Sequence, residues 1–158
     1  MVELFTDGAS SGNPGPGGYG AILRYGPHIK ELSGGFRKTT NNRMELLAVI
    51  VGLEALKKPG QEVVVYTDSK YVADAVEKKW VFGWAAKNFA GKKNKDLWLR
   101  FSELARDFKI KFKWVKGHAD NPYNNRCDEL ATIAADGKDL LIDEEYEREI
   151  TAKKNTLL

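Results

Sequence analysis

Four acidic residues stand where an apolar run ends or where the buried stripe of a helix begins. Asp7 and Asp68 each close an apolar run in a Thr-Asp pair, so two predicted strands end in a carboxylate. Glu45 and Asp128 each follow the first residue of a predicted helical stripe, about 100° around the helix from the core. Ligands of open α/β sheets gather outside the carboxyl ends of strands, and hard cations such as Mg²⁺ prefer carboxylate oxygens. The four positions together predict one metal site.

Each carboxylate also has a structural explanation when it is taken alone. A turn would account for Asp7, and the start of a helix would account for Asp68. A capping box that begins at Asn42 would account for Glu45, while the helix macrodipole would favour Asp128 in an early turn. Capping does not require two further acids at the ends of apolar strands, and we therefore interpret the four residues as one site.

The elements that must position these side chains follow from hydrophobic periodicity. It predicts strands over residues 2–7, 18–24, 29–36, 62–67 and 110–115, and helices over residues 42–58, 70–78, 95–108 and 125–135. The first three strands are expected to form an antiparallel meander, whereas strand–helix–strand alternation in the second half predicts parallel pairing. Glycines and prolines between residues 8 and 20 predict a tight loop that presents its backbone. The fold class is therefore α/β.

Composition indicates a globular protein with a single domain. The 158 residues are 42% hydrophobic, which is enough for one sizeable core. The chain starts in a strand rather than in a charged and apolar leader, and no apolar run approaches spanning length, so we expect a cytoplasmic protein without membrane contact. The single cysteine, Cys127, excludes an intrachain disulfide and, with only two histidines, argues against structural zinc. We expect a monomer.

Five blocks of sequence carry a resemblance to a known family. In chain order they are TDGASSGNPGPGGYG at 6–20, TTNNRMEL at 39–46, YTDS at 66–69, WVKGHA at 114–119 and NRCDELA at 125–131. Through these blocks the chain resembles type 1 ribonuclease H in its bacterial single-domain form. The resemblance implies a ribonuclease H-like fold, with a mixed five-stranded sheet and helices on both faces. We place a ribonuclease H catalytic domain at 1–142 and an acidic C-terminal tail, partly docked or frayed, at 143–158.

The resemblance implies an endonuclease that cuts the RNA strand of RNA–DNA hybrids, with low sequence specificity and with 5′-phosphate products. The four acidic residues would ligate two Mg²⁺ ions, with Mn²⁺ as a substitute, and Asp7 would bridge both ions. Two ions about 4 Å apart can hold the attacking water and the leaving oxygen on opposite sides of the scissile phosphate. His118 lies in a loop rich in polar residues, and it is assigned an auxiliary role in proton handling and product release.

A second group of candidate residues is basic and aromatic. Residues 78–116 contain 12 Lys or Arg against 3 Asp or Glu, a local net charge of +9 in a chain of net charge +3. Tryptophans and phenylalanines interleave with these lysines, which is typical of a surface that grips a nucleic-acid backbone. The segment resembles the family's basic protrusion, but it is shorter than in some bacterial relatives and has Phe89 where they often carry tryptophan. A merely solvated basic face is the alternative.

The resemblance assigns contacts with the hybrid to polar, basic and aromatic residues in several parts of the chain. These are Asn13, Lys38, Thr40, Asn41, Asn42, Lys70, Trp80, Trp84 and Asn94, and the basic charge of residues 78–116 adds Lys92 and Lys93. The two tryptophans would line the channel of the DNA strand, with core packing as the alternative, while Lys38, Thr40 and Asn94 would hold a DNA phosphate. The three other asparagines and Lys70 would contact the minor groove, which displays 2′-hydroxyls, or flank the site. Lys70 replaces the family's common glutamine, so it keeps a donor but loses an acceptor.

Two other functions would use the same features. A non-catalytic module that binds hybrids would explain the basic and aromatic segment, but it would leave the carboxylates and His118 without a role. A DNA-acting nuclease of the same fold, like a transposase or resolvase, would also use acidic residues and two metal ions. The block at 41–45 and the Lys-Gly-His sequence at 116–118 favour ribonuclease H.

Overall fold

The computed structural model describes all residues except 78–82, 85, 88–91, 117–120 and 158. Its strands are β1 (Val2–Ser10), β2 (Gly15–Tyr25), β3 (His28–Thr39), β4 (Glu62–Thr67) and β5 (Lys109–Trp114). Its helices are α1 (Asn41–Glu54), α2 (Lys70–Glu77), α4 (Lys95–Ala105), α5 (Pro122–Ala135) and α6 (Glu144–Leu157). Among the described residues, no helix combines the length and the apolar character needed to span a membrane.

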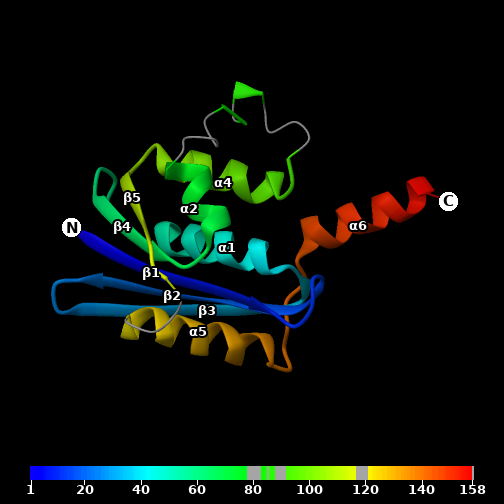
Figure 1. The fold of residues 1–158 in the computed structure, drawn as a ribbon, viewed down its shortest axis with the longest axis horizontal. Helices are drawn as coiled ribbons and strands as arrows, with labels where there is room; N and C mark the ends of the chain where they lie inside the picture. Colours follow the sequence, from blue (N-terminus) through cyan, green and yellow to red (C-terminus); the bar gives the residue numbers. More distant parts are fainter. Residues whose placement is uncertain (78–82, 85, 88–91, 117–120, 158) are drawn as a thin grey trace.

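One mixed five-stranded sheet with the order β3-β2-β1-β4-β5 forms the centre of the molecule (Figure 1). β1 pairs antiparallel with β2, and β2 pairs antiparallel with β3, which confirms the predicted meander. β4 lies parallel to both β1 and β5, as the strand–helix–strand alternation predicted. The parallel pairing brings the carboxyl ends of β1 and β4 toward the same edge of the sheet.

Helices cover both faces of the sheet. α1, α2 and α4 lie on one face, and α5 lies on the other (Figure 1). The larger core lies between the sheet and α1 and includes Leu4 and Ile50, both fully buried. α1 is buried along most of its length, as expected of a helix that contacts the sheet on one side and α4 on the other. The smaller core, under α5, contains Phe5, Ile22 and Cys127.

The start of the sheet differs from the prediction. β1 continues past Asp7 to Ser10, and the turn to β2 is confined to residues 11–14. The predicted end of β1 and the predicted long glycine-rich loop are therefore wrong. Gly20 lies in β2, and its lack of a side chain lets α5 pack directly against the strand. A Cβ on Gly20 would stand 2.3 Å from the carbonyl oxygen of Cys127. Close helix packing, rather than a loop, explains this glycine.

Helix boundaries differ from the prediction where caps decide them. α1 begins after Thr40, whose hydroxyl oxygen accepts a hydrogen bond from the backbone N–H of Arg43, so the capping box at residue 42, the alternative explanation for Glu45, does not form. α5 begins at Pro122, and Asp128 therefore lies in the second turn of the helix rather than in the first. Neither helix has an acid in its first turn, so capping explains neither Glu45 nor Asp128. α1 and α4 also end about one turn earlier than predicted.

The chain ends in a helix that the sequence analysis did not predict. α6 stands away from the sheet (Figure 1), and the side chains that are described along it are exposed or half-buried. It follows an isolated bridge between Phe36 and Leu141 that holds the preceding segment against β3. Local ion pairs, such as Lys153 with Glu149 at 3.9 Å, support the helix from within.

Candidate active site

Two acidic residues lie at matching positions beyond the paired parts of β1 and β4. The parallel register pairs Phe5 with Tyr66, so Asp7 and Asp68 each follow two residues further along their strands. Asp7 is buried within β1, whereas Asp68 is half-buried directly after the end of β4. The structure thus brings these two carboxylates together, as the strand pattern predicted.

Glu45 reaches this pair because α1 lies very close to β1. A Cβ at Gly8 would stand 2.4 Å from the backbone nitrogen of Glu45, so only glycine permits the approach. Glu45 is 4% exposed. One carboxylate oxygen from each of Asp7, Glu45 and Asp68 lies within 4.8 Å of the other two. We call this group of three residues, which come from β1, from the residue after β4 and from α1, the carboxylate triad.

The electrostatics of the carboxylate triad favour a bound cation. Burial raises the pKa of Glu45 well above its ordinary value, and the negative charges of Asp7 and Asp68 raise it further. Within the part of the chain that the structure describes, no donor reaches the buried Oε2 of Glu45. A divalent cation would remove the repulsion and give this oxygen a partner. Because every donor is a carboxylate oxygen, the site suits hard ions such as Mg²⁺ or Mn²⁺.

Asn124 joins the two strands that carry the aspartates. From α5, its Nδ2 donates hydrogen bonds to the carbonyl oxygens of Thr6 at 3.2 Å and Tyr66 at 3.1 Å. Those residues lie one and two positions before Asp7 and Asp68. Asn124 is 2% exposed, and no described donor reaches its Oδ1. The position of this residue was not predicted, because an asparagine at the start of a helix normally indicates capping or solvent exposure.

Asp128, the fourth predicted ligand, lies outside the carboxylate triad. It is half-buried on α5, which contacts β1 through a hydrogen bond of 3.2 Å from Cys127 Sγ to the carbonyl oxygen of Phe5. Among the described acidic residues, only the carboxylate triad meets within 4.8 Å, and metal ligation by Asp128 stays a prediction. His118 and Trp80 lie outside the described residues, so their roles also stay predictions.

Six of the predicted substrate contacts line one cavity of about 580 Å³ at the N-terminus of α1. They are Asn13, Thr40, Asn41, Asn42, Lys93 and Asn94. Asn13 Oδ1 accepts hydrogen bonds from the backbone of Asn41 at 2.8 Å and from Ser10 Oγ at 3.0 Å, which ties the β1–β2 turn to α1. Asn94 has a left-handed backbone with φ of 62°, a conformation that asparagine tolerates and that is enriched at functional sites. We call this space the α1 cavity.

Lys70 and Lys38 lie outside the α1 cavity. Lys70 is exposed, with Nζ 4.7 Å from the ring centroid of Trp114. The indole N–H of Trp114 donates to the carbonyl oxygen of Asp68 at 3.0 Å, so a cation–aromatic pair stands directly beside the carboxylate triad. Trp114 had no role predicted from the sequence. Lys38 is half-buried near the end of β3, and its charge helps to lower the pKa of Glu147, which is lowered mainly by a hydrogen bond from a neighbouring arginine.

Trp84 is partly packed in the core and partly accessible, so it is compatible with both alternatives, core packing and contact with the DNA strand. Its ring packs edge-on against the fully buried Trp98, with centroids 5.8 Å apart, so part of it belongs to the core. The side chain is nevertheless half-buried rather than enclosed, and Lys92 Nζ lies 5.0 Å from the centroid of its ring. Lys92 and Lys93 are both exposed. A contact between Trp84 and the DNA strand therefore stays a prediction.

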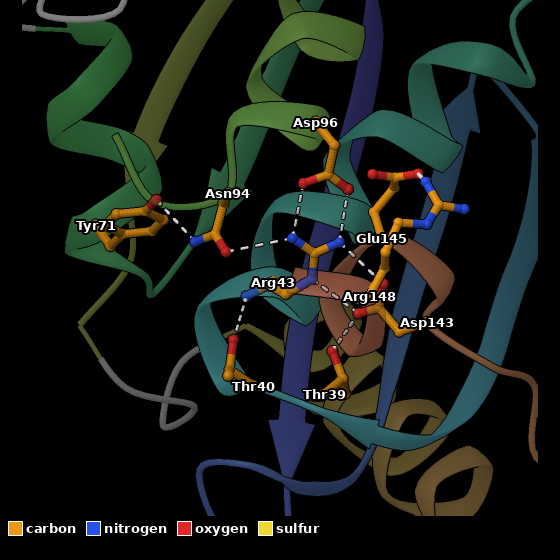
Figure 2. Close-up of polar contacts among 9 residues, drawn as sticks. All are labelled: Thr39, Thr40, Arg43, Tyr71, Asn94, Asp96, Asp143, Glu145 and Arg148. Atoms are coloured by element: carbon orange, nitrogen blue, oxygen red, sulfur yellow. Dashed lines mark hydrogen bonds and ion pairs between the residues drawn. The ribbon is translucent and has the colours of Figure 1, made fainter. Parts of the chain in front are cut away.

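Beside the α1 cavity, Arg43 is the centre of a buried network that the sequence did not predict (Figure 2). It is 1% exposed, and it donates two hydrogen bonds to Asp96 at 2.8 and 2.7 Å and two to Asp143 at 2.8 and 2.9 Å. Burial alone would lower the pKa of Arg43, but its hydrogen bonds with these carboxylates outweigh burial and raise it. Arg43 Nη1 also contacts Asn94 Oδ1 at 3.4 Å, while Asn94 Nδ2 donates to the hydroxyl of Tyr71 at 3.0 Å. The network thus fixes the orientation of the Asn94 amide.

Sequence comparison places this architecture among known proteins. A family model described as RNase H matches residues 1–136. A ribonuclease H of Desulforamulus reducens is 54% identical over 147 residues, which cover 90% of this chain and 92% of that protein.

Comparison with solved structures leads to the same family. LC9-RNase H1, described as a type 1 RNase H with the type 2 active-site motif, is 30% identical with a TM-score of 0.75, covering 85% of this chain and 71% of its own. LC11-RNase H1, solved in complex with an RNA/DNA hybrid, shares the fold at 24% identity with a TM-score of 0.68, over 86% of this chain and 97% of its own. From the family model and the extent of the sequence identity, this chain belongs to the ribonuclease H family.

Proposed function

We propose that the protein is an endoribonuclease that hydrolyses the RNA strand of RNA–DNA hybrids. The observation that carries this proposal is the carboxylate triad, in which three acids share a largely buried space in a chain of the ribonuclease H family. Buried like charges are unfavourable unless a cation accompanies them, so their grouping indicates a catalytic site rather than a structural one. The name of the relatives supports the reaction, and the hybrid bound to LC11-RNase H1 supports the substrate.

The proposed cofactor is Mg²⁺, as two ions in the presence of substrate, with Mn²⁺ as a substitute. The carboxylate triad would hold these ions, Asp7 would contact both, and Asp128 would complete the ligand set. Bound divalent ions would stabilise the negative charge that develops on the scissile phosphate. The chain itself contributes fixed spacing, because Gly8 seats α1 against β1 and Asn124 joins β1 to β4. His118 is assigned proton transfer and a role in product release.

The α1 cavity supports a contact with a phosphate of the DNA strand. Thr40 accepts its hydrogen bond through Oγ1 and keeps a hydroxyl proton to donate, while Lys93 and the N-terminus of α1 add positive charge. Glu45 follows Thr40 by five residues, roughly 8 Å along the helix axis, so one rigid helix spaces the DNA contact from the metal site. Lys38, Lys70, Lys92 and the two tryptophans would contact the same hybrid. Contacts with backbone rather than with base edges imply low sequence specificity.

The proposed organisation is a monomer in the cytoplasm. Residues 1–142 would be the catalytic domain, because they contain the whole sheet, both cores and the carboxylate triad. Residues 143–158 would be an acidic addition to that domain, docked at its beginning through Asp143. A buried free thiol at Cys127 is compatible with a reducing compartment.

A cleavage assay with three matched duplexes tests the proposed function. An RNA–DNA hybrid, a duplex RNA and a duplex DNA of one sequence, each labelled on either strand, are incubated with the protein in Mg²⁺, Mn²⁺ or EDTA. We expect cleavage of the RNA strand of the hybrid alone, with 5′-phosphate products, in either metal and not in EDTA. Cleavage of duplex DNA would indicate the transposase-like alternative. Retardation of the hybrid in a native gel without cleavage in either metal would indicate a binding module.

A further inference from the structure

Part of the α1 cavity is lined by residues of α6 for which no function was predicted from the sequence. Besides the turn after β1, the start of α1 and the start of α4, the cavity is lined by four residues of α6: Tyr146, Glu149, Ile150 and Lys153. Their spacing of three and four residues places them on one face of the helix. This face lines the same cavity as Thr40, Lys93 and Asn94, the residues that would hold a DNA phosphate. α6 therefore contributes surface to the predicted substrate path.

The first turn of α6 is anchored firmly to the body of the protein. Asp143, which precedes the helix, accepts two hydrogen bonds from Arg43 and one from Thr39 Oγ1 at 2.7 Å (Figure 2). The ring of Tyr146 lies 5.5 Å from Cζ of the same arginine. Arg37 adds a pair of hydrogen bonds to Glu147 at 2.9 and 2.8 Å. These contacts fix where the helix starts, and so they fix the position of its lining face.

The chemistry of the α1 cavity suits a nucleic-acid backbone. Its other walls offer amide, hydroxyl and ammonium donors, and its ionised lining residues are Lys93 and Lys153 against Glu149, a net charge of +1. Lys93 and Lys153 also line a neighbouring groove between α6 and α4, so the same two lysines border both hollows. Glu149 Oε1 lies 3.9 Å from Lys153 Nζ, which partly neutralises the lysine when no polyanion is present. An approaching phosphate would compete with this glutamate for the lysine.

We propose that α6 is a substrate-binding element in which Lys153 binds a backbone phosphate of the DNA strand, next to the phosphate held by Thr40 and Asn94. Glu149 opposes this contact and lowers its strength. The inference rests on the proposed function, because it concerns the same hybrid. It gives α6 a role in substrate binding. α6 lies outside residues 1–136, the range that the family model matches.

Three single substitutions on α6 test this inference. Lys153→Gln removes the proposed phosphate contact, Glu149→Gln removes its competitor, and Lys154→Gln removes an equal charge from a neighbouring residue that does not line the α1 cavity. Affinity for a fluorescent RNA–DNA hybrid is measured by anisotropy in EDTA over a series of salt concentrations, and KM and kcat are measured in Mg²⁺. The residues are exposed or take part only in a weak ion pair, so folding should be unaffected.

The expected results differ in sign. Lys153→Gln should weaken binding about threefold at low salt, the size of a surface ion pair, and Glu149→Gln should strengthen it about twofold. The slope of log affinity against log salt should fall by up to about 0.9 in Lys153→Gln, and kcat should be unchanged. Equal affinity and slope for Lys153→Gln and Lys154→Gln, with normal hybrid cleavage by the wild type, would overturn the inference alone. A wild type that neither binds nor cleaves the hybrid would overturn the proposed function as well.

Discussion

Two groups of charges lie two residues apart on α1, and they are built in opposite ways. Glu45 faces the carboxylates of Asp7 and Asp68, and its Oε2 has no donor among the described residues. Arg43 meets two carboxylates through four hydrogen bonds between 2.7 and 2.9 Å. Both side chains are almost completely buried. Buried charge therefore serves stability where it is compensated, whereas a cluster of buried acids without compensation favours binding of a cation.

The largest difference between the two groups should appear in catalysis. Asp7→Asn should reduce hybrid cleavage in saturating Mg²⁺ by at least about 10³-fold, because several kcal/mol of charge stabilisation depend on ions that Asp7 would hold. The amide conserves the shape of the side chain and removes a repulsion, so urea unfolding without Mg²⁺ should show no loss of stability. Asp107→Asn, an exposed acid at the opposite edge of the sheet, is the control. Substantial Mg²⁺-dependent cleavage by folded Asp7→Asn would remove the carboxylate triad as the proposed site.

The free energy of unfolding should depend more on the Arg43 network than on the carboxylate triad. Arg43→Ala leaves two carboxylates without their shared partner and should lower the free energy of unfolding by about 3–5 kcal/mol in urea titrations. Arg126→Ala is the matched control, because it breaks an ion pair with Glu31 at 2.8 Å whose side chains are both 42% exposed. Its loss should stay below about 1 kcal/mol. If both substitutions cost the same, the Arg43 network is no more than another surface contact.

Adding Mg²⁺ should stabilise the protein through the carboxylate triad and should have no effect through the Arg43 network. At ten times the dissociation constant, a single ion bound only by the folded state adds about 1.4 kcal/mol to the free energy of unfolding. Thermal unfolding of the wild type should therefore shift upward with Mg²⁺ and return when EDTA is added. Asp96→Asn should keep this response, whereas Asp7→Asn should lose it. A response retained in Asp7→Asn would mean that the ion binds elsewhere.

The smallest expected effect is the acid sensitivity of the Arg43 network. Burial opposes ionisation of Asp96, but hydrogen bonds with Arg43 and the charge of Arg43 outweigh burial and lower the pKa of this carboxyl below its ordinary 3.8. Because the unfolded chain then takes up the proton more readily, the ionised pair adds stability above pH 3.8 and loses it as pH falls through the lowered pKa. Urea titrations at several acid pH values should show a flatter dependence in Asp96→Asn. An unchanged profile would show that Arg43 does not govern this carboxyl.

The strand-borne half of the site was predictable, because local patterns encode it. Apolar runs that end in Thr-Asp located Asp7 and Asp68, and the parallel pairing followed from the order of strands and helices. The approach of Glu45 was less accessible, since it depends on the absence of a side chain at Gly8, and a glycine after an aspartate ordinarily indicates a turn. Periodicity and spacing predicted an acidic metal site, whereas the resemblance to ribonuclease H predicted the reaction and the hybrid substrate.

The network and the last helix were not predictable for a different reason. Arg43 is separated from Asp96 by 53 residues and from Asp143 by 100, so no local pattern connects them. Within Asn-Asn-Arg-Met-Glu an arginine resembles a solvent-exposed helix residue, and only the tertiary structure shows that it is buried. α6 has few apolar residues and begins directly after the anchored Asp143, so its position depends on distant contacts rather than on its own sequence.

The hydrogen bonds of Asn124 have a consequence for how readily the site accepts an ion. One amide spans the carbonyl oxygens of β1 and β4, and it belongs to the helix that also carries Asp128. The separation of the backbone at Asp7 and Asp68 is therefore set before any ion arrives, by this amide together with the pairing of β1 and β4. Ion affinity should then depend on charge and dehydration, with little conformational entropy lost on binding. Such a site would bind and release its ions rapidly, without a folding transition to slow either step.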